Sequence, residues 1–284
     1  VLKGEKNKRY TANIRVNADY KRFAISFGIS GRVSEKKYTP QNVGLLNYAY
    51  NTSRAIPATA EDGSLWYYDR PRSRDGMFTY KFNIVNERDN SRNTIDGEGF
   101  SFNTNIKYRI TKGLRLGATL AYGTDNTVNE TYYGEKTFYI ANLRRGEYGK
   151  IGRESECPYG GELKHSSTKN KNYMLRLQFD YNTHLDETGN HKLNASLGGE
   201  ISSVKYTGLD KTFRGYLPER GKMITPIKPG DYEVYAEWLT RNPNALGILK
   251  DQLTNKVSSY VSASYIYKNF FVFNFNSRID ASNK

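Results

Sequence analysis

Apolar and polar residues alternate from the start of the chain. The first apolar row occupies every second position from 10 to 20, with Tyr at both ends, and polar residues fill most of the gaps. After Lys21-Arg22 the alternation resumes at Phe23 and continues to position 31. Successive side chains of a strand point to opposite faces of the sheet. The pattern therefore predicts a hairpin with one apolar and one polar face, closed by a turn at Lys21-Arg22 that pairs Tyr20 with Phe23.

Three more segments repeat this hairpin pattern. They run over 100–122 with a turn at 111–113, over 173–201 with a turn at 186–190, and over 257–279 with a turn at 268–269. The sequence predicts a left-handed backbone at Gly113, the last turn residue of the second hairpin.

Long segments separate the four hairpins, over about 34–98, 125–171 and 202–255. Each is much longer than a usual connection of roughly four to six residues. Short turns therefore lie at one end of the predicted strands and long loops at the other. Helical spacing is weak, and the best short helices are expected near 45–50 and 232–239.

Composition narrows the classes of protein. The formal charge is +14, but Lys and Arg are spread over every segment, so we expect no nucleic-acid partner. The chain lacks an apolar run of about 20 residues, which argues against membrane helices. An outer-membrane barrel stays possible despite a mean hydropathy of -0.76, because its apolar residues alternate with polar ones.

Two environments for the apolar face stay open: the interior of a secreted soluble β-sandwich for carbohydrate binding or adhesion, and the lipid around an outer-membrane barrel. The asymmetric loops and the aromatic residues near strand ends favour the barrel. The prediction is an all-β fold, an antiparallel up-and-down transmembrane barrel. We expect residues 1–284 to be part of a single barrel domain and to supply about 8–10 strands of a larger barrel. The few strands and the ends of the chain predict a fragment.

Four stretches resemble the central barrel of SusC/RagA-type TonB-dependent transporters, in that family's order and spacing. They are Asn51–Pro57 with Asp62-Gly63-Ser64, Asn83–Asn90, Pro158–Gly161, and Asn255–Tyr260 leading to Arg278–Ser282. The resemblance covers essentially the whole chain and rests on the ordered set rather than on one motif.

The resemblance implies a role in nutrient import across the outer membrane of a Gram-negative bacterium. Such transporters have a barrel of roughly 22 strands around a plug. A SusD-like surface lipoprotein delivers oligosaccharides or peptides, and the TonB complex powers import. Neither a plug nor a TonB-binding segment is recognisable in this sequence, so the expected role is that of barrel wall and extracellular loops, in contact with outer-membrane lipid.

Candidate contacts with the substrate are aromatic and basic residues of the long segments: Trp66, Tyr67, Tyr68, Arg70, Arg72, Tyr132 and Tyr133. Flat aromatic faces beside polar donors suit sugar rings, although the same residues also suit packing of the loops against the rim. Candidate lumen-facing residues are Arg15, Lys107, Arg109, Arg115 and Arg176. They predict a positive field in the passage.

Other chemistry finds no support in the sequence. Phosphate loops, zinc-ligand spacings and catalytic triads are missing. Cys157 has no evident activating partner. The prediction is a non-enzyme with neither a metal nor a cofactor.

Overall fold

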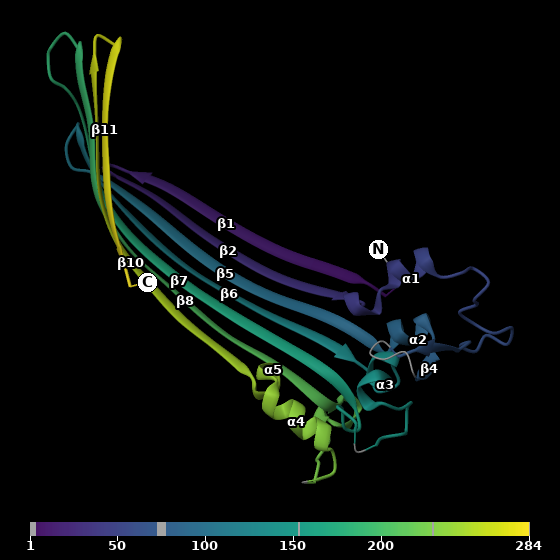
Figure 1. The fold of residues 1–284 in the computed structure, drawn as a ribbon. Helices are drawn as coiled ribbons and strands as arrows, with labels where there is room; N and C mark the ends of the chain where they lie inside the picture. Colours follow the sequence, from purple (N-terminus) through teal and green to yellow (C-terminus); the bar gives the residue numbers. More distant parts are fainter. Residues whose placement is uncertain (1–3, 73–77, 153, 229, 284) are drawn as a thin grey trace.

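The computed structural model describes residues 4–72, 78–152, 154–228 and 230–283. Eight long strands follow one another in a single antiparallel meander (Figure 1). They are β1 (Lys6–Tyr20), β2 (Phe23–Tyr38), β5 (Ser91–Arg109), β6 (Leu114–Tyr133), β7 (Gly161–His184), β8 (His191–Leu217), β10 (Ile248–Tyr267) and β11 (Phe271–Ser282). A short strand, β9 (Met223–Ile224), adds to β8.

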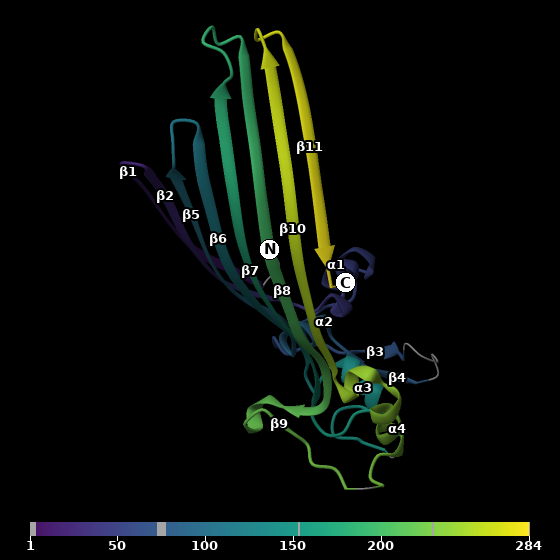
Figure 2. The same ribbon diagram turned by 90° about the vertical axis from the view of Figure 1, so that its left-hand side faces the viewer.

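The sheet is curved and open (Figures 1 and 2). Within the described ranges, β1 and β11 each pair on one side only. The predicted fold class, an antiparallel sheet with the strand order of a partial barrel, is confirmed.

All four hairpins lie where the alternation predicts, and Tyr20 pairs with Phe23. The predicted backbone at Gly113 is wrong, because this glycine does not have a positive φ. Gly113 is needed for a close approach instead: a Cβ there would lie 2.6 Å from the carbonyl oxygen of Asn182 on β7.

The strands extend well beyond the predicted ends at the loop side. β5 begins at Ser91 rather than near 100, and β6 continues to Tyr133. The three long connections are correspondingly shorter, at 39–90, 134–160 and 218–247. In the extra lengths both faces carry polar residues, so the ladder continues where the alternation stops.

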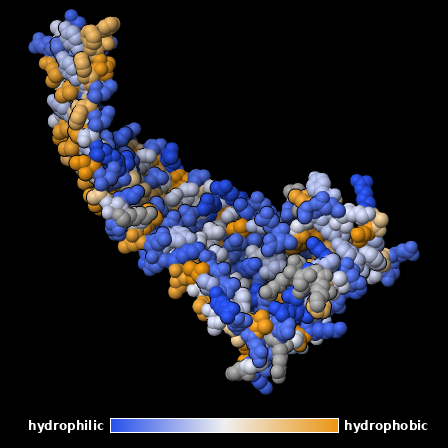
Figure 3. All heavy atoms as spheres, in the orientation of Figure 1, coloured by the Kyte–Doolittle hydropathy of each residue, from blue (hydrophilic) through white to orange (hydrophobic). Residues whose placement is uncertain are grey.

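Register sorts the side chains into two faces. Tyr20, Phe23, Tyr108, Leu116, Phe179, Leu197 and Val261 form one row across the sheet, on what we term the apolar face. The opposite, polar face includes the row Asn17, Ser26, Asn105, Thr119, Arg176, Glu200, Ser258 and Asp280. In Figure 3 hydrophobic atoms gather along the left and lower outline of the sheet, and hydrophilic atoms cover much of the opposite outline.

The apolar face is exposed. Ile14 is 60% and Leu177 is 48% accessible, and both clusters of buried hydrophobic residues lie at the loop end of the sheet. The soluble sandwich is therefore wrong for this chain, because in the described structure no second sheet covers this face.

The first two long connections, 39–90 and 134–160, contain most of the buried residues, and we term them the cap. The cap contains η1 (Gln41–Val43), α1 (Leu45–Asn51), the hairpin β3 (Tyr68–Pro71) with β4 (Thr79–Phe82), α2 (Ile84–Asp89) and α3 (Phe138–Arg144). The third connection contains η2 (Pro218–Arg220), β9, α4 (Glu233–Arg241) and α5 (Pro243–Leu246). Helices α1 and α4 confirm the two predicted helical segments, whereas α2, α3 and α5 lie in segments without predicted helices.

Candidate functional site in the cap

The cap packs against the polar face at the loop end of the sheet. Tyr133 points to the same side of β6 as Thr119, since both positions are odd in an unbroken strand. Its ring stacks on that of Tyr139 in α3 with centroids 3.9 Å apart, and it is 2% exposed. Ile140 and Cys157 complete this buried cluster. The cap therefore lies on the side of the sheet that would border the passage of a barrel.

Asn83 connects two parts of the cap through hydrogen bonds. Its side-chain oxygen accepts hydrogen bonds from the backbone N–H groups of Val85 and Asn86, so it caps the N-terminus of α2. Its amide nitrogen donates to the carbonyl oxygens of Ala58 and Trp66, at 2.7 Å each. This one buried side chain therefore joins α2 to the segment that presents the candidate aromatic residues.

Glu87 joins α2 to α3. Its buried carboxylate accepts a hydrogen bond from the backbone N–H of Phe138 at 2.7 Å. Burial raises the pKa of Glu87, and the hydrogen bonds from Phe138 and Asn86 oppose the rise. The two halves of the cap, far apart in sequence, are thus held together by polar contacts as well as by packing.

An aromatic cluster fills the space between β4 and α3. Phe82 and Phe138 meet edge to face with centroids 5.5 Å apart, and Tyr68 contacts Phe82 in the same way at 5.5 Å. The guanidinium of Arg70 lies 4.5 Å from the centre of the Phe82 ring. Such contacts stabilise a cluster by roughly 0.5–1.5 kcal/mol each beyond burial of area. Phe82 and Arg70, whose guanidinium carbon also lies 5.2 Å from the centre of the Phe138 ring, therefore hold the β3–β4 hairpin against α3.

A buried ionic network anchors the second half of the cap to the sheet. Arg214 on β8 donates to Glu162 on β7 at 2.8 Å, and the hydroxyl of Tyr139 donates to the same carboxylate at 2.7 Å. Burial, with Glu162 nearby, raises the pKa of Tyr139 and keeps its hydroxyl protonated. The indole of Trp238 in α4 covers Arg214, 3.9 Å from its guanidinium carbon. The network therefore joins α3, through Tyr139, to β7, β8 and α4.

Arg144 connects the two ends of the segment 134–160. Its side chain is fully buried, pairs with Glu135 at 2.6 Å and donates to the carbonyl oxygen of Gly160 at 2.7 Å. Gly160 has a φ of 111°, which strains any other residue. These contacts give a structural reason for the Pro158–Gly161 motif. Cys157 next to it is buried, and burial raises its thiol pKa to about 11, which makes it a poor nucleophile.

The predicted contact residues are divided between surface and interior. Trp66 and Tyr67 are 38% and 39% exposed. Tyr67 lines a cavity of about 220 Å³ together with Lys81, Lys136 and Tyr148. Arg72 is buried. Trp66 stacks on Tyr68 with ring centroids 6.1 Å apart, whereas no described contact joins Tyr67 to Trp66, Tyr68 or Arg70.

Tyr132 and Tyr133 end on opposite faces of β6. Tyr133 is buried under α3, as described above. Tyr132 continues the apolar face beyond the apolar rows, where the guanidinium carbon of Arg92 lies 4.8 Å from its ring centre and Tyr216 meets it edge to face. These two candidates therefore do not share a site with Trp66 and Tyr67.

The five basic candidates all lie on the polar face. Arg15, Lys107, Arg109 and Arg115 occupy the same parity of their strands as Asn17, Asn105 and Thr119. Arg176 pairs with Glu200 at 2.5 Å, and Arg115 lies directly opposite Asp180 on β7. These acidic neighbours weaken the positive field that the basic residues alone predict. That these residues face a lumen stays a prediction.

The polar face also holds a cavity of about 450 Å³, lined by Arg176, Gln178, Tyr260 and Arg278 among others. The hydroxyl of Tyr260 on β10 donates to Gln178 on β7 at 2.6 Å, across the intervening strand β8. Tyr260 is not among the predicted site residues, because the residues next to it in sequence do not indicate a contact two strands away.

The described part of the chain shows neither a metal-binding group nor a membrane-spanning helix. There, no group of three or more His, Cys, Asp or Glu side chains is placed to hold a metal ion. Nor does any helix there combine the length and hydropathy needed to cross a membrane.

Comparisons with known proteins find solved structures with a similar fold. No family model and no curated protein matches the sequence. Among solved structures, the RagAB peptide importer in its "open-open" state aligns with a TM-score of 0.69 at 14% identity. The "closed-closed" state aligns with a TM-score of 0.67 at 15% identity. Both alignments cover 98% of this chain and 28% of the matched chain.

A likeness at this identity establishes a fold. The matched structures are transporters, and this chain spans a little more than a quarter of their length. The chain therefore has the fold of part of these transporter structures, as its ordered motifs predict.

Proposed function

We propose that these strands form part of the wall of a TonB-dependent importer in the outer membrane, and that the cap forms part of its extracellular vestibule. One observation carries the proposal: the apolar face is exposed along the whole sheet, while the cap packs on the opposite face at one end only. An apolar face without a protein partner suits lipid, and a cap on the other face suits the mouth of a passage.

The substrate in this proposal is an oligosaccharide or a peptide delivered by a SusD-like lipoprotein. The likeness to the RagAB peptide importer supports the peptide. Energy would come from the TonB complex, so no catalytic residue is expected. The residues proposed to meet the substrate are Trp66 and Tyr67, whose side chains are accessible, and the ring of Tyr68 supports Trp66 by stacking.

Surface labelling tests the orientation. The single cysteine, Cys157, is buried with a raised thiol pKa, so background labelling by a maleimide is expected to be low. In the full-length protein, Glu61→Cys in the cap is expected to react with a membrane-impermeant maleimide on intact cells. Glu187→Cys in a short turn is expected to react only after the outer membrane is permeabilised. Equal labelling of both positions on intact cells would refute the proposal.

Uptake tests the contact residues. The double variant Trp66→Ala/Tyr67→Ala is expected to reduce substrate uptake by up to about tenfold, since loss of stacking near 1.4 kcal/mol corresponds to that factor. Tyr50→Ala is the matched control, because Tyr50 is an exposed aromatic residue of the same cap. Uptake that falls equally in both variants would remove Trp66 and Tyr67 from the proposed vestibule contact.

A further inference from the structure

Lysines gather on the apolar face immediately beyond a row of three aromatic residues. That row consists of Phe102, Tyr122 and Tyr173. Two residues further toward the loops, the row reads Phe100, Thr124, Lys171 and Lys205, and the next contains Glu98, Asn126 and Lys169. Each step is about 6.6 Å along a strand. If the aromatic row marks the membrane interface, these lysines lie at the level of the lipid headgroups.

Lys171 and Lys205 are direct cross-strand neighbours, a pairing of like charges that destabilises a sheet. Lys205 has an acidic neighbour, since its Nζ lies 3.6 Å from Asp251. Lys169 and Lys171 form no ion pair with any residue that the structure describes, and both are exposed. Glu98 lies two strands from Lys169, or about 10 Å. An anion bound beside the lysines would offset their repulsion.

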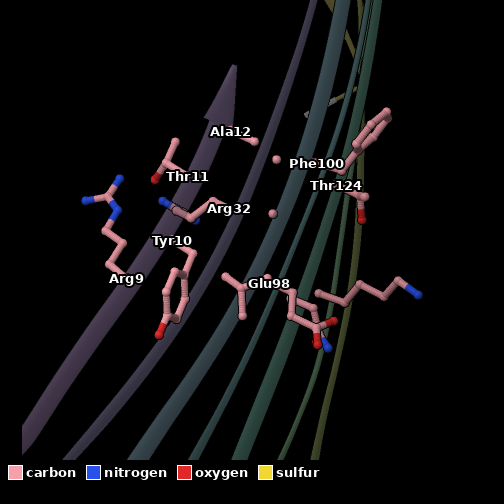
Figure 4. Close-up of a pocket in the computed structure, with 13 residues that line it drawn as sticks. Arg9, Tyr10, Thr11, Ala12, Arg32, Glu98, Phe100 and Thr124 are labelled. Carbon is pink, nitrogen blue, oxygen red and sulfur yellow. The ribbon is translucent and has the colours of Figure 1, made fainter. Parts of the chain in front are cut away.

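A groove of about 870 Å³ adjoins the lysines on the same face. Its floor consists of Ala12 and Gly31, which pair across β1 and β2, and a Cβ at Gly31 would meet no atom within 4 Å. Tyr10, Val33 and Phe100 form its apolar walls, and Lys169 lies at its edge. Figure 4 shows Phe100 and Thr124 pointing to one side of the sheet, away from Arg9 and Thr11.

We propose that this surface binds a phosphorylated glycolipid of the outer leaflet. Its sugar headgroup would lie over Ala12 and Gly31, which belong to the same row as Lys171, and its phosphate would contact Lys169, Lys171 and Lys205. Its acyl chains would lie over the apolar rows on the turn side of the aromatic row. Gly31 and Lys171 are three strands apart, roughly 14 Å, and Ala12 lies one strand further, so the row has the width of a sugar headgroup with its phosphate. The inference rests on the membrane orientation in the proposed function.

Mass spectrometry of co-purified lipid tests the site. The full-length protein is extracted from outer membranes in mild detergent, and the phosphorylated glycolipid retained per protein is measured. The variant Lys169→Gln/Lys171→Gln/Lys205→Gln is expected to retain at least fivefold less. The matching Lys→Arg variant is expected to retain as much as the wild type, which also shows that substitution here permits folding. Lys256→Gln on the polar face of β10 serves as the control.

Three results would overturn the inference. The first is equal retention by the Gln variant and the wild type. The second is displacement of the lipid by millimolar inorganic phosphate, which would indicate a site for free anions. The third is equal retention of a dephosphorylated glycolipid, which would leave the lysines without a role. Surface labelling at Glu61→Cys and Glu187→Cys is independent of lipid, so correct labelling with a negative lipid result refutes this inference alone.

Discussion

At the scale of single residues, glycines on the polar face let neighbouring side chains cross a strand. A Cβ at Gly198 would lie 2.3 Å from the Tyr260 ring, which passes over this glycine to reach Gln178. Gly99 on β5 is crossed in the same way, by the ion pair between Arg32 on β2 and Asp125 on β6, whose atoms lie 2.6 Å apart. The missing side chain is therefore a structural requirement at both positions, because the contact spans two inter-strand distances.

Adjacent glycines make this requirement testable. Gly198→Ala is expected to destabilise the barrel by about 1–3 kcal/mol, because the new methyl group displaces Tyr260. Gly199→Ala is the control in the same strand: its Cβ would meet its nearest neighbour at 3.7 Å, an ordinary contact. Urea unfolding of the full-length protein in lipid vesicles measures both. Equal stability of the two variants would contradict the argument.

At the scale of elements, the junction of α2 and α3 is expected to depend on pH through Glu87. Its pKa is raised in the folded state, so the folded cap binds the proton more tightly than the unfolded segment does. The free energy that holds the junction together should therefore fall as pH rises from 4.5, the pKa of the unfolded state, through the raised pKa of the folded state. At higher pH it should stay level. Glu87→Gln keeps an oxygen for the Phe138 N–H and should abolish this slope.

Hydrogen exchange of the α2 and α3 amides between pH 4 and 8, corrected for the intrinsic rate, measures this dependence. Asp89→Asn is the control, because this carboxyl belongs to the same helix and is exposed. A slope that persists in Glu87→Gln would assign the titration to another group.

The same elements show what the sequence predicts and what it does not. Alternation locates every hairpin because the apolar rows keep a strict period of two, and this signal disappears where β5 and β6 continue with polar residues on both faces. The cap escapes prediction for a different reason. The contacts of Asn83 with Ala58 and Trp66, and of Glu162 with Arg214, join residues at separations of 17 to 52 positions. The sequence thus shows that Tyr133 is aromatic and that Arg70 is basic. Only the fold shows that Tyr133 is buried and Arg70 is exposed.

At the scale of the whole molecule, the two faces of one strand predict opposite responses to the same charge. Leu120 lies on the apolar face in the row of Phe27 and Leu175, and Thr119 is its neighbour on the polar face. Leu120→Arg is expected to destabilise the barrel by about 2–4 kcal/mol if the row lies at the bilayer midplane, because a guanidinium cannot be solvated there. Thr119→Arg should destabilise by less than about 1 kcal/mol: the new guanidinium lies directly opposite Arg176, a like-charge pair, but on the polar face it stays hydrated. Vesicle unfolding and the amount of folded protein in the outer membrane measure both variants. If Thr119→Arg proves the more damaging of the two, the apolar face does not meet lipid, and the assignment of wall and passage to the two faces must be reversed.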